Sequence, residues 1–215
     1  LFTATTILYS SYVNTGSTSN SYYAAIIALI GVFVGYFYTA KPIRLSSRYG
    51  LGELSIFLSF GPLLTLGTGF AIASDTILLY SKEFYNLLIL GIPIGLLTTN
   101  ILFINQYPDY TSDKKVGKNH LVVLLGKKAS RWIYAINTAV AIGSLYFISE
   151  NILNDTQGLL FLYILIPVSM IYSYYLISGL FKYYNSRELI KYNIHTIYFH
   201  MFFSFIYMII LANFQ

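Results

Sequence analysis

The sequence predicts an all-α fold, a multi-pass transmembrane helical bundle. Of the 215 residues, 56% are apolar and only 10% are charged, whereas a soluble domain carries about a quarter charged residues. The mean hydropathy is +0.63, and uncharged runs long enough to cross about 30 Å of hydrocarbon recur along the chain. These observations exclude a soluble globule and a disordered chain, and they predict a single domain over residues 1–215 in a lipid bilayer.

The uncharged runs define seven hydrophobic segments. The first, residues 1–13, is too short to span a membrane. Because the chain opens with Leu and has no basic segment before this run, we interpret it as the remainder of a longer helix and the domain as N-terminally incomplete. Six full spans are expected at residues 21–40, 54–74, 84–108, 132–149, 156–181 and 192–215.

Basic residues are concentrated in alternate connections of this bundle. They follow the first, third and fifth full spans, and only Lys82 lies in another connection. The positive-inside rule therefore places the three basic connections in the cytoplasm. Their residues are Lys41, Arg44 and Arg48; Lys114, Lys115, Lys118, Lys127, Lys128 and Arg131; and Lys182, Arg187 and Lys191.

The net charge and the absence of Cys exclude several classes of function. The net charge of +5 is small and follows the membrane topology, so no nucleic-acid partner is expected. The chain has no Cys, which excludes disulfides, thiolate zinc sites and a cysteine nucleophile.

Two of the eight acidic residues lie together at the cytoplasmic end of the third full span. Asn105, Asp109 and Asp113 recur every four residues, so their oxygen-bearing side chains form one stripe if the helix continues. Pro108 must either kink this helix or begin a new one. Two neighbouring carboxylates repel each other and favour a bound cation, and Mg²⁺ suits an oxygen-only set that water and phosphate complete.

A cationic turn is expected on the same face. The run FYTAKPIRLSSRYGLGEL contains Tyr38, Lys41 and Arg44, and its Pro and Gly residues are typical of a structured turn. Arg as a bidentate fork and Lys as a point charge, placed beside a magnesium-binding carboxylate pair, could hold a diphosphate. The same run ends with Glu53, which either favours a helix N-terminus or orients a nearby Arg.

Simpler interpretations stay open for each of these residues. The acids could pair with Lys114, Lys115 and Lys118 in a solvated loop, and the cationic turn could reflect topology alone. His120 either contacts an acceptor or phosphate, or is a solvated loop residue.

The segment from Asn105 to Gly126, N-x-x-x-D-x-x-x-D-K-x-x-G-K-x-x-L-V-V-L-L-G, resembles the second aspartate motif of the UbiA superfamily of intramembrane prenyltransferases. The runs YTAKPIRL and GLGEL resemble the connection between the fourth and fifth helices of that superfamily. The resemblance implies a nine-helix protein with another aspartate motif after its second helix. On that numbering the chain starts within the third helix.

The resemblance also implies roles for individual residues. Asp109 and Asp113 would bind Mg²⁺, with Asn105 as a further ligand or a hydrogen-bonding support. Diphosphate contacts are expected from Tyr38, Lys41, Arg44 and Lys118.

By the same resemblance, the expected activity is Mg²⁺-dependent transfer of a prenyl group from a polyprenyl diphosphate to an aromatic quinone precursor. The menaquinone branch is the most similar, which makes 1,4-dihydroxy-2-naphthoate the expected acceptor. The location would be the cell membrane of a prokaryote, with the active site on the cytoplasmic side. The alternatives are transfer to a glyceryl-phosphate ether lipid in archaeal lipid synthesis, or a non-enzymatic transporter or assembly subunit.

Overall fold

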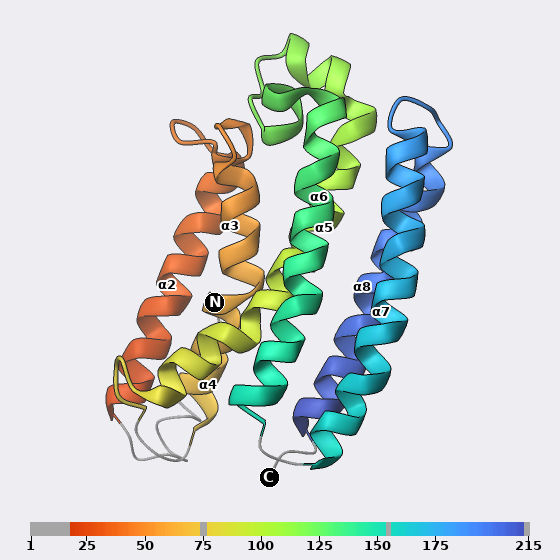
Figure 1. Cartoon of the computed structure of the whole chain (residues 1–215). Coiled ribbons are helices and arrows are strands. Elements are labelled where there is room, and N and C mark those ends of the chain that lie inside the picture. Colours follow the sequence, from red (N-terminus) through yellow and green to blue (C-terminus); the bar gives the residue numbers. More distant parts are fainter. Residues whose placement is uncertain (1–17, 74–76, 154–155, 213–215) are drawn as a thin grey trace.

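The computed structural model describes residues 18–73, 77–153 and 156–212, and within these ranges the chain is a bundle of helices without a strand (Figure 1). The all-α prediction is therefore confirmed. The predicted partial helix at residues 1–13 lies outside the described residues. The elements are α2 (Thr18–Thr39), η1 (Leu45–Ser47), α3 (Leu51–Phe60), α4 (Pro62–Ile72), α5 (Lys82–Lys115), α6 (Leu121–Asn151), α7 (Thr156–Tyr183) and α8 (Leu189–Ala212).

Within the described ranges, six stretches of helix are long and apolar enough to cross a membrane, as the sequence predicts. They coincide with the six expected full spans, with α3 and α4 together forming the second. The basic connections that follow α2, α5 and α7 all lie at one end of the bundle, which is the upper end in Figure 1. The positive-inside pattern thus corresponds to one physical face of the molecule.

The second span is broken between α3 and α4, which hydropathy does not reveal. Pro62 begins α4 at a position where a helix needs no backbone N–H donor. A Cβ atom on Gly61 would lie 2.6 Å from the carbonyl oxygen of Gly91 and 2.9 Å from the Cα of Gly95. Only Gly residues permit this close contact with α5, and Thr65 Oγ1 reinforces it by donating to the Leu87 carbonyl at 2.7 Å.

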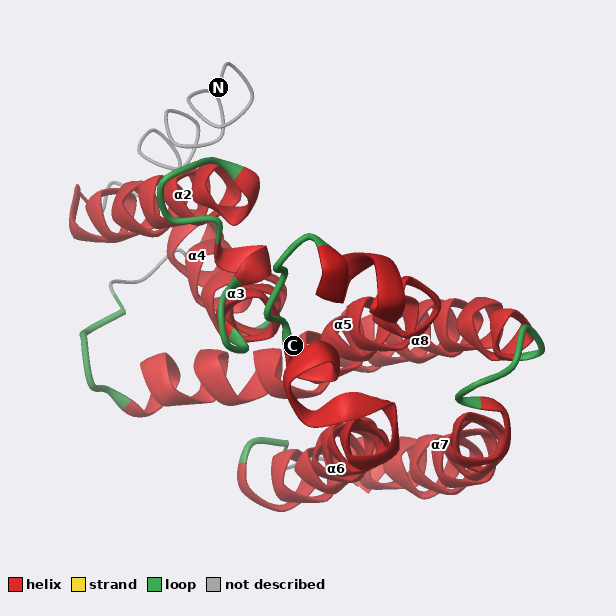
Figure 2. Cartoon of the chain, turned by 90° about the horizontal axis from the view of Figure 1, so that it is seen from above, coloured by secondary structure: helices red, strands yellow, loops and turns green. Residues whose placement is uncertain are grey.

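Helix α5 is the central element of the bundle. It packs against α3 and α4 and also against α6 and α8, as the view along the bundle shows (Figure 2). The helix continues through Pro108 to Lys115, so it extends beyond the predicted end at residue 108. Asn105, Asp109 and Asp113 therefore lie on one continuous helix, which is the condition that the predicted stripe requires.

Helix α6 also begins earlier than the span predicted at residues 132–149. Its first turn starts at Leu121, and Gly126 then interrupts the helical geometry with φ 78° and ψ 154°. A positive φ of this size favours Gly. The short first turn, residues 121–125, lies at the basic end of the bundle and is oriented separately from the long part of the helix.

Polar side chains within the spans bond to one another across helices. Asn100 of α5 donates to the Thr138 hydroxyl of α6 at 2.8 Å and accepts from Asn137 at 3.1 Å. The Tyr134 hydroxyl meets that of Thr196 in α8 at 2.9 Å. Such bonds hold helices together where no water is present to replace them. The two His residues of α8 are bonded in the same way, His195 to Tyr172 and His200 to Thr98.

Candidate functional site

The cationic turn and the acidic helix end are joined by backbone hydrogen bonds. The N–H of Tyr49 donates to the carbonyl of Asn119 at 2.7 Å, and the N–H of Asn119 donates to the carbonyl of Ser47 at 3.1 Å. This short parallel pairing between Arg48 and Asn119 connects segments that are about 70 residues apart in the chain. The two polar segments that the sequence singles out therefore lie side by side.

The cationic turn is held by its own backbone. The N–H of Arg44 donates to the Ala40 carbonyl at 2.9 Å, and Arg48 Nη2 donates to the Pro42 carbonyl at 2.8 Å. Lys41 is exposed and Arg44 is half-buried, and in the described part of the chain neither pairs with a carboxylate. Both cations are consequently available to an anionic ligand. Tyr38 is half-buried in the last turn of α2, just before this turn.

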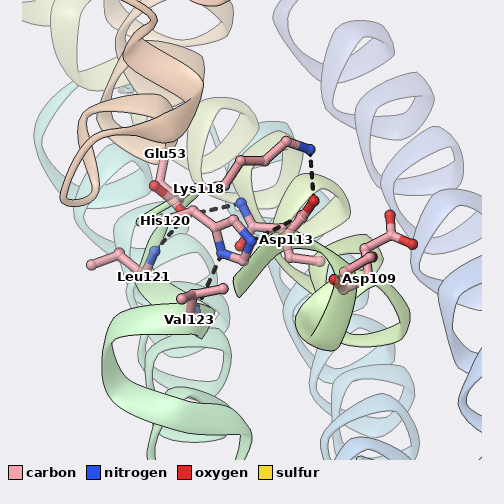
Figure 3. Close-up of polar contacts among 9 residues, drawn as sticks. Glu53, Asp109, Asp113, Lys118, His120, Leu121 and Val123 are labelled. Carbon is pink, nitrogen blue, oxygen red and sulfur yellow. Dashed lines mark hydrogen bonds and ion pairs between the residues drawn. The ribbon is translucent and has the colours of Figure 1, made fainter. Parts of the chain in front are cut away.

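The acidic stripe begins with Asn105 and Asp109. The side-chain oxygen of Asn105 accepts from the amide of Asn193 in α8 at 3.0 Å. Asp109 is exposed, and its carboxylate has no hydrogen bond or ion pair to any residue that the structure describes. Figure 3 shows this carboxylate directed away from the polar contacts around Asp113. Asp109 is thus the free carboxylate of the pair.

Asp113 is engaged on both of its oxygens (Figure 3). Lys118 Nζ lies 2.7 Å from Oδ1, and His120 Nε2 lies 3.1 Å from Oδ2. The side chain is only 12% exposed, so both contacts are partly shielded from water. The solvated-loop interpretation therefore does not describe Asp113, although the pair with Lys118 that it anticipated is present. Asp109 is exposed, as that interpretation expected.

His120 has a role that neither sequence interpretation anticipated. Its ring is 2% exposed and caps α6, because Nδ1 accepts from the backbone N–H of Val123 at 3.4 Å. With Nδ1 acting as an acceptor, the proton of the neutral ring lies on Nε2 and is donated to Asp113. His120 therefore fixes the orientation of this carboxylate from the start of α6.

Glu53 ties three elements together from the first turn of α3. Its Oε1 accepts from Gln106 Nε2 of α5 at 2.9 Å and from the backbone N–H of Leu121 in α6 at 3.1 Å. The residue is 4% exposed and, among the residues that the structure describes, it pairs with no Arg, contrary to one of the two sequence interpretations. Its Oε2 and the Oε1 of Gln106 have no hydrogen-bond partner within the described ranges. Two buried acceptors in one place leave the site able to take a further donor or a cation.

These residues offer a suitable but incomplete set of magnesium ligands. The ranges 18–73, 77–153 and 156–212 contain no group of three or more His, Asp or Glu side chains that could hold a metal. Mg²⁺ commonly takes only one or two carboxylates and fills its other positions with water and substrate phosphates. Asp109 offers one free carboxylate, whereas both oxygens of Asp113 already contact Lys118 and His120 and would have to be shared with the metal. Lys41 and Arg44 are cations of the kind that a phosphorylated ligand needs.

Comparison with known proteins gives one family. The family model described as "UbiA prenyltransferase family" matches residues 1–208. The 1,4-dihydroxy-2-naphthoate octaprenyltransferase of Bacillus subtilis (strain 168) is 32% identical over 123 residues, which are 57% of this chain and 37% of that protein. The 2-carboxy-1,4-naphthoquinone phytyltransferase of Synechocystis sp. (strain ATCC 27184 / PCC 6803 / Kazusa) is 32% identical over 127 residues, 58% of this chain and 37% of the relative.

A third similar protein is the 1,4-dihydroxy-2-naphthoate octaprenyltransferase of Escherichia coli (strain K12). It is 33% identical over 113 residues, which are 53% of this chain and 34% of that protein. The chain thus spans little more than a third of the length of these curated relatives. No solved structure matches it.

Proposed function

Since the chain belongs to the UbiA prenyltransferase family, we propose that the protein transfers a prenyl group from a polyprenyl diphosphate to an aromatic acceptor in membrane quinone biosynthesis. The observation that carries this proposal is the backbone pairing of Tyr49 and Ser47 with Asn119. It brings the segment that contains Lys41 and Arg44 next to the loop that follows the acidic end of α5, at one end of a membrane bundle. A magnesium diphosphate needs both kinds of group.

Asp109 and Asp113 are the proposed magnesium ligands, with Asn105 as a further ligand or support. When bound, Mg²⁺ neutralises negative charge on the diphosphate and so makes it a better leaving group. The protein's own contribution at these positions is orientation. His120 holds Oδ2 of Asp113, and the long α5 helix carries both acids at a fixed spacing.

Tyr38, Lys41, Arg44 and Lys118 are the proposed diphosphate contacts. Their N–H and O–H donors would stabilise the charge that develops on the departing diphosphate as the allylic C–O bond breaks. Lys118 Nζ lies 2.7 Å from Asp113 Oδ1, so its ammonium is already at the acidic end of α5. The acceptor ring would then supply the electron pair that forms the new C–C bond, and loss of a proton or of CO₂ from the attacked ring carbon would restore its aromaticity. Apolar side chains around the site would keep water from the allylic carbon.

A bicyclic naphthoate is the proposed acceptor, most simply 1,4-dihydroxy-2-naphthoate. Support comes from the names of similar proteins, two of which refer to dihydroxynaphthoate and one to a carboxy-naphthoquinone. A transporter would place its unsatisfied polar groups near the middle of the membrane. Here the mid-span amide of Asn100 is bonded on both sides, and the free carboxylate of Asp109 lies at the basic end.

The site is proposed to face the cytoplasm of a prokaryotic cell, because all three basic connections share its end of the bundle. The functional test uses membranes that contain the full-length protein, labelled geranylgeranyl diphosphate, and either dihydroxynaphthoate or a glyceryl-phosphate ether as acceptor. We expect Mg²⁺-dependent diphosphate release and a labelled naphthoate product, both abolished by EDTA and restored by added Mg²⁺. If labelled glyceryl ether were the main product, the acceptor would be the glyceryl-phosphate ether and not the naphthoate. If no acceptor supported diphosphate release, the enzymatic function would be refuted.

A further inference from the structure

A second cation-lined cleft lies at the same end of the bundle, between α5, the start of α6 and the turn from α7 to α8. It consists of two adjoining cavities of about 490 Å³ and 450 Å³ that share Lys127, Tyr184 and Asn185. Arg187 lines the first cavity and Lys128 lines the second. No acidic residue lines either cavity.

The cleft is distinct from the acidic stripe because it faces the other side of α5. Tyr107, which lines it, lies two positions from both Asn105 and Asp109, or about 200° around the helix. The hydroxyl of Tyr107 bonds to Ser130 of α6 at 2.8 Å, which places this side of α5 against α6. The inference below therefore does not depend on the proposed prenyl transfer.

The break in α6 positions the lysines of the cleft. Gly126 has φ 78°, and Lys127 and Lys128 directly follow it at the start of the long part of the helix. The ammonium of Lys127 lies 5.6 Å from the centre of the Tyr110 ring, within range of a cation–π interaction. Within the described ranges, no carboxylate pairs with Lys127, Lys128 or Arg187. Lys127 is thus held by the Tyr110 ring, whereas Lys128 and Arg187 are exposed, and in the described structure none of the three forms an ion pair.

The neighbouring Arg131, unlike the other cations of this region, is fully engaged by contacts within the protein. The guanidinium of Arg131 lies 4.5 Å from the Phe181 ring and 4.4 Å from the Tyr184 ring. It also donates to the Phe181 carbonyl at 2.9 Å. Arg131 therefore anchors the wall of the cleft, while Lys127 and Arg187 remain available to a ligand.

The lining residues of the cleft and its position at the ends of the spans indicate which class of ligand it can bind. Its lining includes the apolar residues Leu189, which is buried, and Ile190, which is exposed. The turn that follows the end of α7 at Tyr183 also lines it. Cations beside apolar side chains at the ends of membrane spans suit a molecule with a phosphate head and a hydrocarbon tail. We propose that this cleft binds the phosphate headgroup of an anionic phospholipid from the leaflet at the basic end, with Lys127 and Arg187 as its principal phosphate contacts.

Phosphatidylglycerol is a suitable probe. The full-length protein is placed in nanodiscs with increasing fractions of phosphatidylglycerol in phosphatidylcholine, and bound lipid is counted by native mass spectrometry. The double variant Lys127→Gln/Arg187→Gln is compared with Lys115→Gln/Lys191→Gln, which removes the same charge from exposed residues outside both cavities. Each cleft cation should contribute about fivefold, so the cleft variant should bind about 25-fold more weakly and the control within about twofold of the wild type.

Two outcomes would overturn the proposal. Equal weakening in both double variants would mean that diffuse positive charge, and not the cleft, attracts the lipid. Binding of inorganic pyrophosphate that depends on Lys127 and Arg187 and displaces phosphatidylglycerol at micromolar concentration would assign the cleft to a soluble phosphate. Unfolding temperatures in pure phosphatidylcholine show whether the variants fold. If the double variant does not fold, the single variant Arg187→Gln, in an exposed turn, replaces it in the binding experiment.

Discussion

Midway along the bundle, the amide of Asn100 uses its donor and its acceptor on α6, whereas at the basic end the carboxylate of Asp109 bonds to none of the residues that the structure describes. Both residues belong to α5 and lie less than three turns apart. In the first region, the polar groups of Asn100 are satisfied by the neighbouring helix. The second leaves charged groups on a helix end beside the cations of a separate turn.

The difference separates polar residues that hold helices together from those that can bind a ligand. In a membrane, a polar group without a partner is costly, so the larger side chains at mid-span, such as Asn100, Thr138 and Tyr134, pair across helices. Single hydroxyls in the spans, those of Ser59, Ser169, Ser173 and Ser204, are buried without a partner in the described structure. At the basic end, Glu53 Oε2 and Gln106 Oε1 are buried without a partner in the described structure, and Lys41 and Arg44 lack a counter-charge. Unsatisfied groups that converge in one place are typical of a binding site.

The largest effect is expected from the acidic stripe. Asp109→Asn and Asp113→Asn should each lower turnover by about 100-fold or more, because a neutral amide is a poor magnesium ligand and stabilises less developing charge. Labelled prenyl incorporation measures the effect, and thermal unfolding should show that folding is retained. Glu83→Gln, an exposed acid at the other end of the same helix, is the matched control. Wild-type rates in either Asp variant would contradict the metal assignment.

The cationic turn should have a smaller effect that is specific to one substrate. Loss of one charge-assisted hydrogen bond costs about 1.5–3 kcal/mol, so Lys41→Gln and Arg44→Gln should each raise KM for the prenyl diphosphate at least about tenfold. KM for the aromatic acceptor should stay the same. Steady-state kinetics with Lys82→Gln as the control tests this, and an equal rise in both KM values would show that the turn has only a structural role.

Glu53 is expected to affect stability. Glu53→Ala leaves the Leu121 N–H and the Gln106 amide without their acceptor, which should cost about 1–3 kcal/mol of unfolding free energy. Glu53→Gln keeps an acceptor oxygen and should cost less. Unfolding in a detergent titration measures both, and identical losses in the two variants would mean that the negative charge, and not the hydrogen bonds, holds α3 to α6.

The smallest effect is predicted for the mid-span network. Asn100→Ala should reduce stability by about 0.6 kcal/mol for each hydrogen bond that it removes and leave kcat/KM for both substrates unchanged, because bonds of this kind contribute modestly inside a membrane. Asn105→Ala is the informative partner, since it should lower turnover through the loss of a ligand or support. A drop in turnover for Asn100→Ala as large as that for Asn105→Ala would remove the distinction between the two regions.

The sequence was sufficient to predict the six spans and the common end of the basic connections, because charge and hydropathy act over whole segments. It did not reveal the breaks at Gly61 and Gly126. A break depends on which backbone must approach another, and Gly61 is needed because Gly91 and Gly95 of α5 lie against it. Of the two effects expected of Pro108, the start of a new helix is not found, because α5 continues to Lys115.

The candidate site was only partly predictable for a related reason. Asn105, Asp109 and Asp113 share one helix, so their spacing was sufficient to group them. The role of Glu53 depends on Gln106 and Leu121, which are 53 and 68 positions away, and no local pattern encodes such pairs. His120 had a local signal that went unused, since it directly precedes a hydrophobic helix start and caps it.

The most direct test measures binding without turnover. Isothermal titration with an unreactive prenyl thiodiphosphate, with and without Mg²⁺, reports on the acidic stripe and the cationic turn together. The account predicts saturable binding that requires Mg²⁺ and is lost in the Asp109→Asn/Asp113→Asn protein. Binding of equal strength in that variant, or in the absence of any divalent ion, would contradict it.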